Sequence, residues 1–423
     1  MNRSLYSALL YLISPLLLVY LAIRAFKSPD YRGRWGERFG LKDLRQTDLL
    51  LHSVSMGETI AAIPLIKQIQ AIYPDLSITV TTTSPTGSAE VIRAFADEVQ
   101  HCYLPFDLSW CSRRFVKQVA PKTCIIMETE LWPNLVHYLK RNGSKVLLAN
   151  ARLSQKSADA YQKRQRLNLP MLQSLDAIAA QSEQAATRFI ELGVNKNKVK
   201  VCGSLKFDLN VDQVRIEAAK AMREGWKAEH RPVWVAGSVH PGEFELMLQA
   251  HQRVIEQYPT ALMVMVPRHP EQFDAAVTAV KQAKMLVARR SLNHDVTAQT
   301  QVVVGDTMGE LLTLYAAADQ AFVGGTLIES GGHNPLEPAA VGLPVFVGPN
   351  HWDFNEITQL LQNEGALQIV DSSEQLAQML VEMFSNKQAY ATASDAAKQV
   401  VAQNRGALQK QFALVESLIN RKI

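Results

Sequence analysis

Two glutamates, Glu329 and Glu337, enclose a loop whose residue types could bind sugar hydroxyls and a phosphate. Gly331 and Gly332 lie between them and can adopt a positive φ, so a ligand can approach the backbone closely. The carboxylate of Glu337 can accept hydrogen bonds from two neighbouring sugar hydroxyls. The loop therefore predicts a site for a sugar or for the ribose of a nucleotide.

The same loop leads into a helix-like run over residues 335–341. Asn334 is a favourable N-cap, and Pro335 suits the first helical position because no N–H is needed there. The free N–H groups and partial positive charge of such a helix start would suit a phosphate. The alternative is an ordinary loop with a capped helix start, since such starts are common.

Glu58 follows an apolar run at 48–54 and Gly57, and it opens a predicted helix over 58–72. A carboxylate in this place could take the proton of an attacking hydroxyl, which typically accelerates a reaction about 10²–10⁴-fold. The alternative is a first-turn glutamate that only complements the helix dipole. A helix start lowers a carboxylate pKa and a base benefits from a raised one, so burial would have to outweigh the dipole.

Glu128 and Glu130 follow a second apolar run at 123–127. One of the two is expected to line the same cleft as the base and to orient hydroxyls there. The alternative is a surface loop with a capping acid. The hydroxyls of Ser53 and Ser55 could also bond a sugar or a carboxylate.

Two turns in the second half of the chain carry groups suited to a phosphate. Ser238 and His240 close a predicted strand, although a simple strand-to-helix turn is an equally good interpretation. Arg268 follows Pro267, and its guanidinium is charged at any working pH and has a fork geometry that fits a phosphate. His269 could bind a base or ribose, or it could be a loop histidine with an internal partner.

Holding these side chains together requires sheets, because ligands of open α/β folds gather at the carboxyl ends of strands. Apolar runs alternate with helical patterns in two series, which predicts an α/β fold of two parallel sheets with helices on both faces. The expected strands of the first series are 48–54, 77–83, 123–127, 145–149 and 177–180, and those of the second are 233–237, 261–266, 301–304, 321–325 and 345–348. A linker is expected at 204–211, and the tail from residue 373 reads as helical.

Bulk composition supports two globular domains. The 423 residues exceed one ordinary domain, and the 47% hydrophobic content supplies large cores. The net charge of +4, without a basic stripe interleaved with aromatics, gives no indication of nucleic-acid binding. The four cysteines lack zinc spacing and read as free thiols of a reducing compartment.

Residues 4–23 form an uncharged apolar run of about 20 residues, enough to cross ~30 Å of hydrocarbon. A cleaved signal peptide is the competing interpretation, but no convincing small-x-small cleavage site follows. Basic residues follow this run, so the positive-inside rule places the body of the protein in the cytoplasm. Arg32, Arg34 and Arg38 could also contact an anionic lipid head group, or they could merely set topology.

Five motifs, taken in order, resemble the 3-deoxy-D-manno-octulosonic acid (Kdo) transferases of lipid A biosynthesis. They are Tyr31–Phe39, His52–Glu58, Met127–Asn134, Val266–Glu271 and Ser330–Glu337, and they span most of the chain. The resemblance implies a GT-B glycosyltransferase, with two Rossmann-like domains that face a cleft. It implies CMP-Kdo as donor and the lipid A precursor (lipid IVA) as acceptor. Glu58 would then be the catalytic base.

The resemblance also implies a donor site in the second domain. Its implied members beyond those above are Met308, Gly309 and Glu310 at the pyrimidine, and His333, Asn334, Pro335 and Leu336 at the sugar or phosphate. The expected organisation is an inner-membrane anchor at 1–26, an acceptor domain at 27–205, a nucleotide-sugar domain at 206–400, and a last helix at 401–423 that crosses back to the first domain. No Asp-x-Asp motif is evident, so no cofactor and no catalytic metal are expected.

Two rival functions share the alternating pattern. One is another two-domain nucleotide-sugar enzyme, such as a UDP-sugar epimerase or a different glycosyltransferase. The anchor and the basic cluster argue against a soluble epimerase. The other is a two-domain solute-binding protein of the periplasm, which would need a cleaved leader and no Glu58. Neither the number of Kdo units transferred nor the oligomeric state follows from the sequence.

Overall fold

A computed structural model describes residues 1–209 and 211–419 of the chain. Within it the chain divides into two compact units. The first contains residues 1–208 and returns at 405, and the second contains residues 209–404. Each unit is built around one parallel sheet, so the predicted α/β class is confirmed.

The first sheet has the strand order β3-β2-β1-β4-β5-β6-β7, and neighbouring strands pair in parallel. Its strands are β1 (Leu49–His52), β2 (Ile78–Thr82), β3 (Gln100–Tyr103), β4 (Thr123–Met127), β5 (Lys145–Ala151), β6 (Ala177–Ala180) and β7 (Val199–Val201). Alternate residues of β1 serve opposite faces, as the two-residue period of a strand requires. Leu50 packs on one face, while Leu49 and Leu51 pack on the other.

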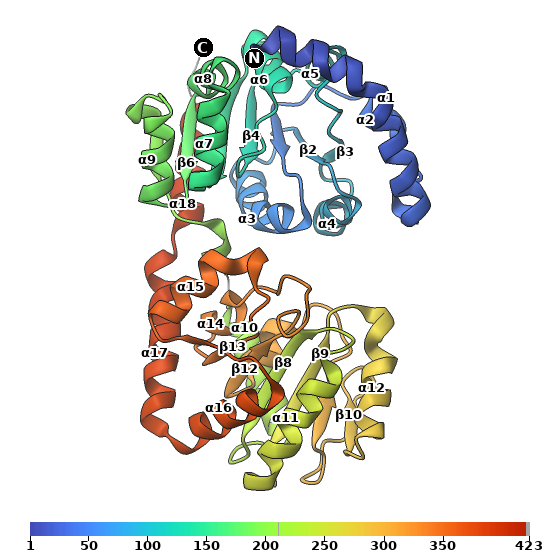
Figure 1. Cartoon of the computed structure of the whole chain (residues 1–423), viewed down its shortest axis with the longest axis vertical. Helices are drawn as coiled ribbons and strands as arrows, with labels where there is room; N and C mark the ends of the chain where they lie inside the picture. The colour runs from blue at the N-terminus through green and yellow to red at the C-terminus, as the bar shows by residue number, and fades with distance from the viewer. Residues whose placement is uncertain (210, 420–423) are drawn as a thin grey trace. The chain divides into compact units, whose positions relative to one another are not determined.

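Helices cover both faces of this first sheet (Figure 1). One face is covered by α5 (Ser109–Val119), α6 (Pro133–Arg141), α7 (Gln155–Lys163), α8 (Gln165–Ser174) and α9 (Glu183–Glu191). The other face is covered by α3 (Met56–Ile72), α4 (Pro85–Phe95) and the last helix, α18 (Ala407–Ile419).

Helix α18 belongs to the first unit although it ends the chain. Phe412 and Val415 lie in the core beside α3 and α4. The buried Gln411 accepts a hydrogen bond from the backbone N–H of Asn150 at 2.8 Å. Asp208 accepts a hydrogen bond from the backbone N–H of Gly406 at 2.7 Å. This bond joins the residue at which the chain leaves the first unit to the segment by which it returns.

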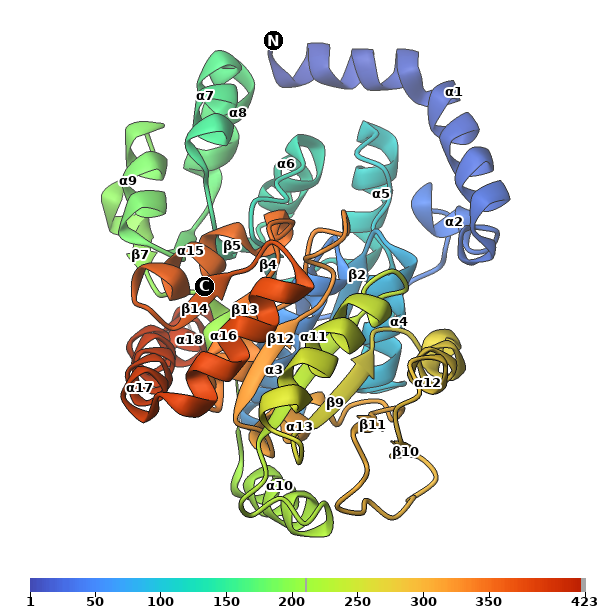
Figure 2. The ribbon, with the colours of Figure 1, turned by 60° about the horizontal axis from the view of Figure 1, so that its bottom comes forward.

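The second sheet has the order β10-β11-β9-β8-β12-β13-β14, also with parallel pairs. Its strands are β8 (Val233–Val239), β9 (Leu262–Pro267), β10 (Val287–Arg289), β11 (Val302–Val304), β12 (Gln320–Val323), β13 (Val345–Val347) and β14 (Leu367–Ile369). Its helices are α10 (Gln213–Gly225), α11 (Phe244–Gln257), α12 (Phe273–Gln282), α13 (Leu311–Ala316), α14 (Leu336–Ala340), α15 (Asn355–Asn363), α16 (Ser373–Ser385) and α17 (Lys387–Asn404). Helices α11, α12 and α16 cover one face, and α10 and α13 pack on the other (Figures 1 and 2).

Both sheets have a point at which the strand order reverses. In the first sheet β1 lies between β2 and β4, and in the second β8 lies between β9 and β12. Open α/β sheets bind ligands outside the carboxyl ends of strands at such a point. Glu58 follows β1 and Glu128 follows β4, while His240 follows β8. The candidate residues therefore fall where this topology favours a site.

The apolar run near the amino terminus forms helix α1 (Arg3–Lys27), followed by the short α2 (Trp35–Arg38). Pro15 lies inside α1, and the helix changes direction about halfway along (Figure 2). The helix is long and apolar enough to cross a membrane. Most of its large apolar side chains are exposed. Its first turns also contact the sheet-containing part of the same unit, where Ser7 Oγ donates to Asn134 Oδ1 at 2.9 Å.

Several expected elements differ in detail. Strands β3, β7, β10 and β14 were not predicted, because they are short and are the edge strands of the two sheets. The expected linker at 204–211 includes a 3₁₀ turn, Leu205–Phe207, whose two apolar side chains are buried. Asn210 of that linker and residues 420–423 of the helical tail lie outside the described residues.

Candidate active site

Glu58 is held at the start of α3 by hydrogen bonds to both carboxylate oxygens. Ser55 is the N-cap, and its Oγ donates to Glu58 Oε1 at 2.9 Å. The backbone N–H of Val54 donates to Oε2 at 2.9 Å. Helix α3 begins at Met56, two residues before the expected start. The carboxylate is thus fixed at the carboxyl end of β1.

The pKa of Glu58 is raised to about 7, chiefly by burial and also by the charges of Glu128 and Glu130, against the hydrogen bonds from Val54 and Ser55. Burial therefore outweighs the helix start, which is the condition that a base at this position has to meet. A carboxyl group with a pKa near neutrality accepts and releases protons at cellular pH. The arrangement resembles a capping box, except that the Glu58 carboxylate accepts from the N–H of Val54, one residue before the N-cap, so Glu58 has a structural role as well.

Glu128 and Glu130 both lie close enough to Glu58 to affect its titration. Glu128 is buried and adopts φ = 53°, which is uncommon for a residue with a side chain. Its carboxylate pairs with Arg152 Nε at 3.1 Å and with Lys206 Nζ at 3.7 Å. Burial also raises the pKa of Glu130. Sequence reasoning did not single out Arg152 or Lys206, because each lies far from Glu128 along the chain.

The two serines expected near the base have different surroundings. Ser53 is fully buried, and its Oγ lies 2.8 Å from Thr59 Oγ1. Ser55 is exposed and is already the N-cap partner of Glu58. Both hydroxyls therefore already have a hydrogen-bond partner within the protein.

The expected lipid-binding arginines lie in different surroundings too. Arg34 pairs with Glu37 at 2.8 Å and donates to Ser88 Oγ at 2.7 Å. Its guanidinium lies 4.2 Å from the centre of the Tyr103 ring, and that of the buried Arg38 lies 4.1 Å from the same ring. Arg32 is exposed, and its Nε donates to the backbone carbonyl of Ala25 in α1. Arg34 and Arg38 thus help to build the first unit.

In the second unit three histidines from three loops meet. The Nε2 atoms of His240 and His333 lie 2.8 Å apart, and their rings are parallel. The ring of His269 lies against His240 with 5.7 Å between centroids. Ser238 adopts φ = 56°, and this strained backbone lies just before the loop that carries His240. Burial, followed by the charge of Arg268, lowers the pKa of His333 to about 3, so that its ring is neutral.

Glu337 lies in the first turn of α14. Burial raises its pKa to about 7, and the positive charge of Arg268 acts in the opposite direction. Arg268 is placed by its backbone N–H, which donates to Val239 O at 2.9 Å, and Pro267 before it is the buried end of β9. A cation and a carboxylate therefore lie within electrostatic reach of each other at the carboxyl end of this sheet.

The loop 329–336 departs from the expected helix start. Helix α14 spans only Leu336–Ala340, and Pro335 is its N-cap. Asn334 still accepts a hydrogen bond from Leu336 N at 3.2 Å, but so short a helix has little dipole to offer a phosphate. The predicted N-cap at Asn334, with Pro335 as the first helical residue, is therefore wrong by one residue, and phosphate binding at this loop stays a prediction. Glu329 is exposed.

The two glycines of this loop do adopt the expected conformation. Gly331 has φ = 89° and Gly332 has φ = 83°. A Cβ on Gly331 would lie 2.5 Å from a carboxylate oxygen of Asp353, and one on Gly332 would lie 2.9 Å from the methyl group of Thr326. Only glycine fits at these positions.

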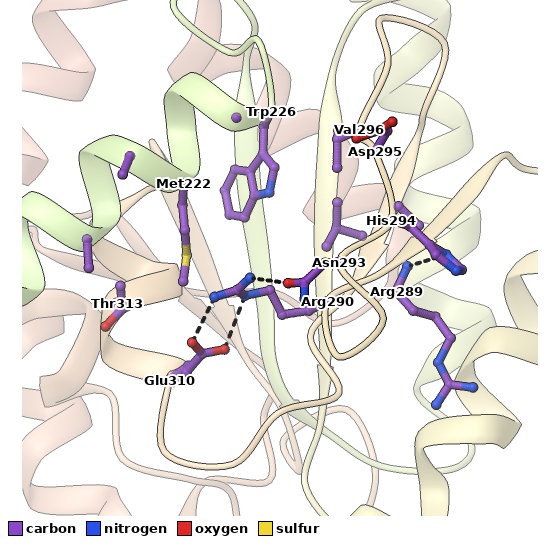
Figure 3. A pocket seen from close by; sticks show the side chains of 15 residues that line it. Met222, Trp226, Arg289, Arg290, Asn293, His294, Asp295, Val296, Glu310 and Thr313 are labelled. Carbon is purple, nitrogen blue, oxygen red and sulfur yellow. Dashed lines mark hydrogen bonds and ion pairs between the residues drawn. The ribbon is translucent and has the colours of Figure 1, made fainter.

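The loop 306–310 is held at both ends by ion pairs, one from the last residue of β10, Arg289, and one from Arg290 after it. Asp306 pairs with Arg289 at 2.7 Å, and Glu310 pairs with Arg290 at 2.9 Å. Figure 3 shows Arg290 between Glu310 and Asn293 in the wall of a cavity of about 500 Å³. Between these anchors Met308 and Gly309 are exposed, and Gly309 adopts φ = 84°. Their backbone is open to a ligand.

Within each unit, then, the structure gathers one set of candidate groups. The first unit brings a carboxyl group poised for proton transfer together with two further acids and a basic pair. The second unit brings histidines, a guanidinium and a carboxyl group around glycine-containing loops. These are the parts that a nucleotide and its sugar require: a cation, neutral donors and exposed backbone.

Comparison with known proteins places this arrangement in a family. The profile described as 3-deoxy-D-manno-octulosonic-acid transferase (kdotransferase) matches residues 33–209. A 3-deoxy-D-manno-octulosonic acid transferase of Haemophilus influenzae is 40% identical over 428 residues, covering 100% of both chains. The corresponding enzyme of Bordetella pertussis is 31% identical and covers 98% of this chain and 99% of its own.

A likeness among solved structures concerns the fold alone. The UDP-GlcNAc 2-epimerase of Neisseria meningitidis, solved with UDP-GlcNAc, matches with a TM-score of 0.57 over 87% of this chain and 99% of that one, at 13% identity. It supports a fold of two parallel-sheet α/β domains of the GT-B type and says nothing of the reaction. The full-length identity to the transferases is what decides: the chain belongs to the 3-deoxy-D-manno-octulosonic acid transferase family of glycosyltransferases.

Proposed function

We propose that this protein transfers Kdo from CMP-Kdo to a lipid A precursor, lipid IVA, with Glu58 as general base. The substrates are those that the family resemblance implies, and relatives named Kdo transferases match the whole length of the chain. The observation that carries the mechanism is the buried carboxyl group of Glu58, whose pKa is raised to about 7 at the carboxyl end of β1.

The proposed step is a substitution at the anomeric carbon of Kdo. The acceptor hydroxyl oxygen forms a bond to that carbon as its proton passes to Glu58. The bond from the carbon to the phosphate oxygen breaks, and its electron pair leaves with CMP. A positioned carboxylate that removes the proton in the transition state typically contributes about 10²–10⁴-fold.

Glu128 and Glu130 have supporting roles in this proposal. Their negative charges keep the pKa of Glu58 high. Arg152 and Lys206 hold Glu128 and add positive charge beside the acids. One of the two acids would also orient hydroxyls of the acceptor or of Kdo.

The second unit would bind the donor. Arg268 provides a charged fork for the single phosphate, and the imidazoles of His240, His269 and His333 provide hydrogen bonds. The carboxyl group of Glu337 would accept the ribose hydroxyls. The exposed backbone at 308–310 would read the edge of the pyrimidine.

The remaining donor contacts would come from the glycine loop and the strand ends around it. They are Ser238, Pro267, Gly331, Gly332, Asn334, Pro335 and Leu336. Ser53, Ser55, Arg32 and Arg34 would serve the acceptor. Of these four residues, Arg32 fits acceptor binding best, because its side chain is exposed beside α1.

The membrane is the source of the acceptor, so we also propose attachment through α1 to the bacterial inner membrane as a single pass, with both units in the cytoplasm. The exposed apolar surface of α1 and the basic residues after it support this orientation. A helix that crosses the bilayer has to release the contact of Ser7 with Asn134. A reporter fused to the carboxy terminus should be active in the cytoplasm, and activity only in the periplasm would refute this topology.

The function is tested by direct assay of the purified protein. Incubation with CMP-Kdo and lipid IVA, followed by mass spectrometry of the lipid, should show addition of Kdo. Calorimetry with CMP and UMP should show preference for the cytosine nucleotide. A protein that binds uridine nucleotides and leaves lipid IVA unchanged would instead be another nucleotide-sugar enzyme.

A further inference from the structure

Glu243 joins two loops of the second unit through a buried carboxylate, and it had no predicted role. Its side chain is 0% exposed. One oxygen, Oε2, accepts hydrogen bonds from the backbone N–H of Gly325 at 2.7 Å and of His240 at 3.1 Å. The other, Oε1, accepts them from Thr326 at 3.0 Å and Leu327 at 3.1 Å.

These four donors make a binding site for an anion. Three of them are successive amides of the segment 325–327, and Gly325 has φ = 71°. Successive backbone N–H groups that converge in this way form a concave site of the kind that holds phosphates and other anions. Here the anion is supplied by the chain itself, as the carboxylate of Glu243. Burial of a carboxylate destabilises the folded protein unless its oxygens are hydrogen-bonded, and here four N–H groups provide those hydrogen bonds.

The two loops that Glu243 joins follow adjacent strands. The loop 240–243 follows β8, and the segment 324–328 follows β12, its neighbour in the sheet. At these strand ends the backbones approach so closely that a Cβ on Gly324 would lie 2.5 Å from the carbonyl oxygen of Ser238. The carboxylate therefore fixes a junction at the point where the strand order of this sheet reverses.

This junction sets the position of two histidines of the donor site. The N–H of His240 is one of the four donors. Gly325, which provides another, lies against the ring of His333, since a Cβ there would be 3.3 Å from that ring. The 2.8 Å hydrogen bond between His240 and His333 thus depends on two backbone segments that the same carboxylate holds.

We propose that Glu243 is a positioning residue of the donor site: its carboxylate occupies the amide site of residues 325–327 as an internal anion and thereby holds His240 against His333. The inference rests on the proposed binding of CMP-Kdo to this unit. Glu243 itself does not touch the donor, because it is fully buried.

The test measures binding of CMP to the full-length protein by calorimetry for the wild type, Glu243→Ala and Glu243→Gln. Both substitutions leave buried N–H groups without an acceptor, so we expect the Kd for CMP to rise about tenfold or more. The matched control is Glu245→Ala, because Glu245 is exposed in the first turn of the same helix. Its Kd should remain at the wild-type value.

Chemical rescue separates positioning from general destabilisation. Glu243→Ala leaves a cavity of carboxylate size lined by four N–H groups, so sodium formate should restore CMP binding to this variant. Sodium chloride at the same ionic strength should not, and Glu243→Gln, whose side chain fills the cavity, should not respond to formate. Loss of binding that formate leaves unchanged and that parallels a fall in Tm would assign Glu243 to stability alone and overturn the proposal.

A second readout does not depend on CMP. The proton between His240 and His333 should give an imidazole N–H signal in ¹⁵N-histidine NMR of the wild type, identified by its loss in His333→Phe. The signal should be absent in Glu243→Gln, which keeps the side-chain shape, and retained in Glu245→Ala. Retention in a folded Glu243→Gln variant, or a Kd for CMP within about twofold of wild type, would refute the role of Glu243. A wild type that gives the signal without binding CMP would instead refute the proposed function.

Discussion

Ser55 and Glu58 hydrogen-bond each other twice at the start of α3. Ser55 Oγ donates to Glu58 Oε1 at 2.9 Å, and the backbone N–H of Glu58 donates back to Ser55 Oγ at 3.3 Å. A glutamine at the third helical position can complete the same kind of cap as a glutamate. A single substitution at Glu58 can therefore separate its role in capping the helix from its proposed role as the catalytic base.

Glu58→Gln should keep the cap but lose the proton acceptor. We expect transfer of Kdo to fall by about 10²-fold or more, with the free energy of unfolding changed by only about 0.5 kcal/mol and CMP affinity unchanged. Steady-state assays, thermal unfolding and calorimetry measure the three quantities. Ser55→Ala removes the cap itself and should cost about 1 kcal/mol of stability, so it shows the loss of stability that Glu58→Gln should avoid. Near-normal turnover of Glu58→Gln would remove Glu58 from the mechanism.

The pH dependence of transfer follows from the raised pKa of Glu58. The base acts when deprotonated, so activity should fall as the pH drops through about 7, tenfold for each pH unit below it. Glu130→Gln removes a negative charge that raises this pKa, so the acid limb should move to lower pH. The exposed Glu183→Gln is the control and should leave the limb in place. If the rate of the wild type fell only around pH 4.5, burial would not raise the pKa of Glu58 in the working enzyme.

Glu337 should distinguish ribose from deoxyribose. A hydrogen bond from a 2′-hydroxyl to a buried carboxylate is worth about 1.5–3 kcal/mol, so the wild type should bind CMP about tenfold or more tightly than 2′-deoxy-CMP. In Glu337→Gln this ratio should shrink, while the mutation of the exposed Glu329 to Gln should leave it unchanged. Equal affinities of the wild type for the two nucleotides would place the ribose elsewhere.

Gly237 tests the packing beneath the donor loops. A Cβ on this residue of β8 would lie 2.0 Å from the hydroxyl of the buried Tyr315, which has to move. Gly237→Ala should therefore cost about 1–3 kcal/mol in the free energy of unfolding. Gly225→Ala is the matched control, because nothing lies within 4 Å of a Cβ at the end of α10. Equal Tm values for the two variants would contradict this account.

Transfer should not require a divalent ion. The single phosphate of CMP-Kdo carries little charge to neutralise, and Arg268 is available to meet it. Assays in excess chelator should keep the wild-type rate. Loss of activity that magnesium restores would contradict this prediction.

The sequence predicted best the parts that depend on local pattern. The apolar run 123–127 became β4, and Glu58 lies at the start of a helix after β1 as expected. Short strands with polar residues escaped prediction: β3 reads Gln-His-Cys-Tyr and has no apolar run. The length of α14 was also overestimated, because nothing in the run 335–341 marks its end after Ala340.

The parts that could not be predicted depend on residues that are distant along the chain. Arg34 lies over the ring of Tyr103, and Arg152 pairs with Glu128, without any local signal for either contact. The carboxylate of Glu243 reaches amides more than 80 residues further on. Such contacts arise only when the sheet brings the ends of its strands together.

The most direct test of the central claim is the transfer assay itself, run on the wild type and on Glu58→Gln with CMP-Kdo and lipid IVA. The account predicts that mass spectrometry finds Kdo on the lipid with the wild type and almost none with the variant, although both bind CMP equally. Transfer at similar rates by the two proteins, or none by the wild type, would contradict it.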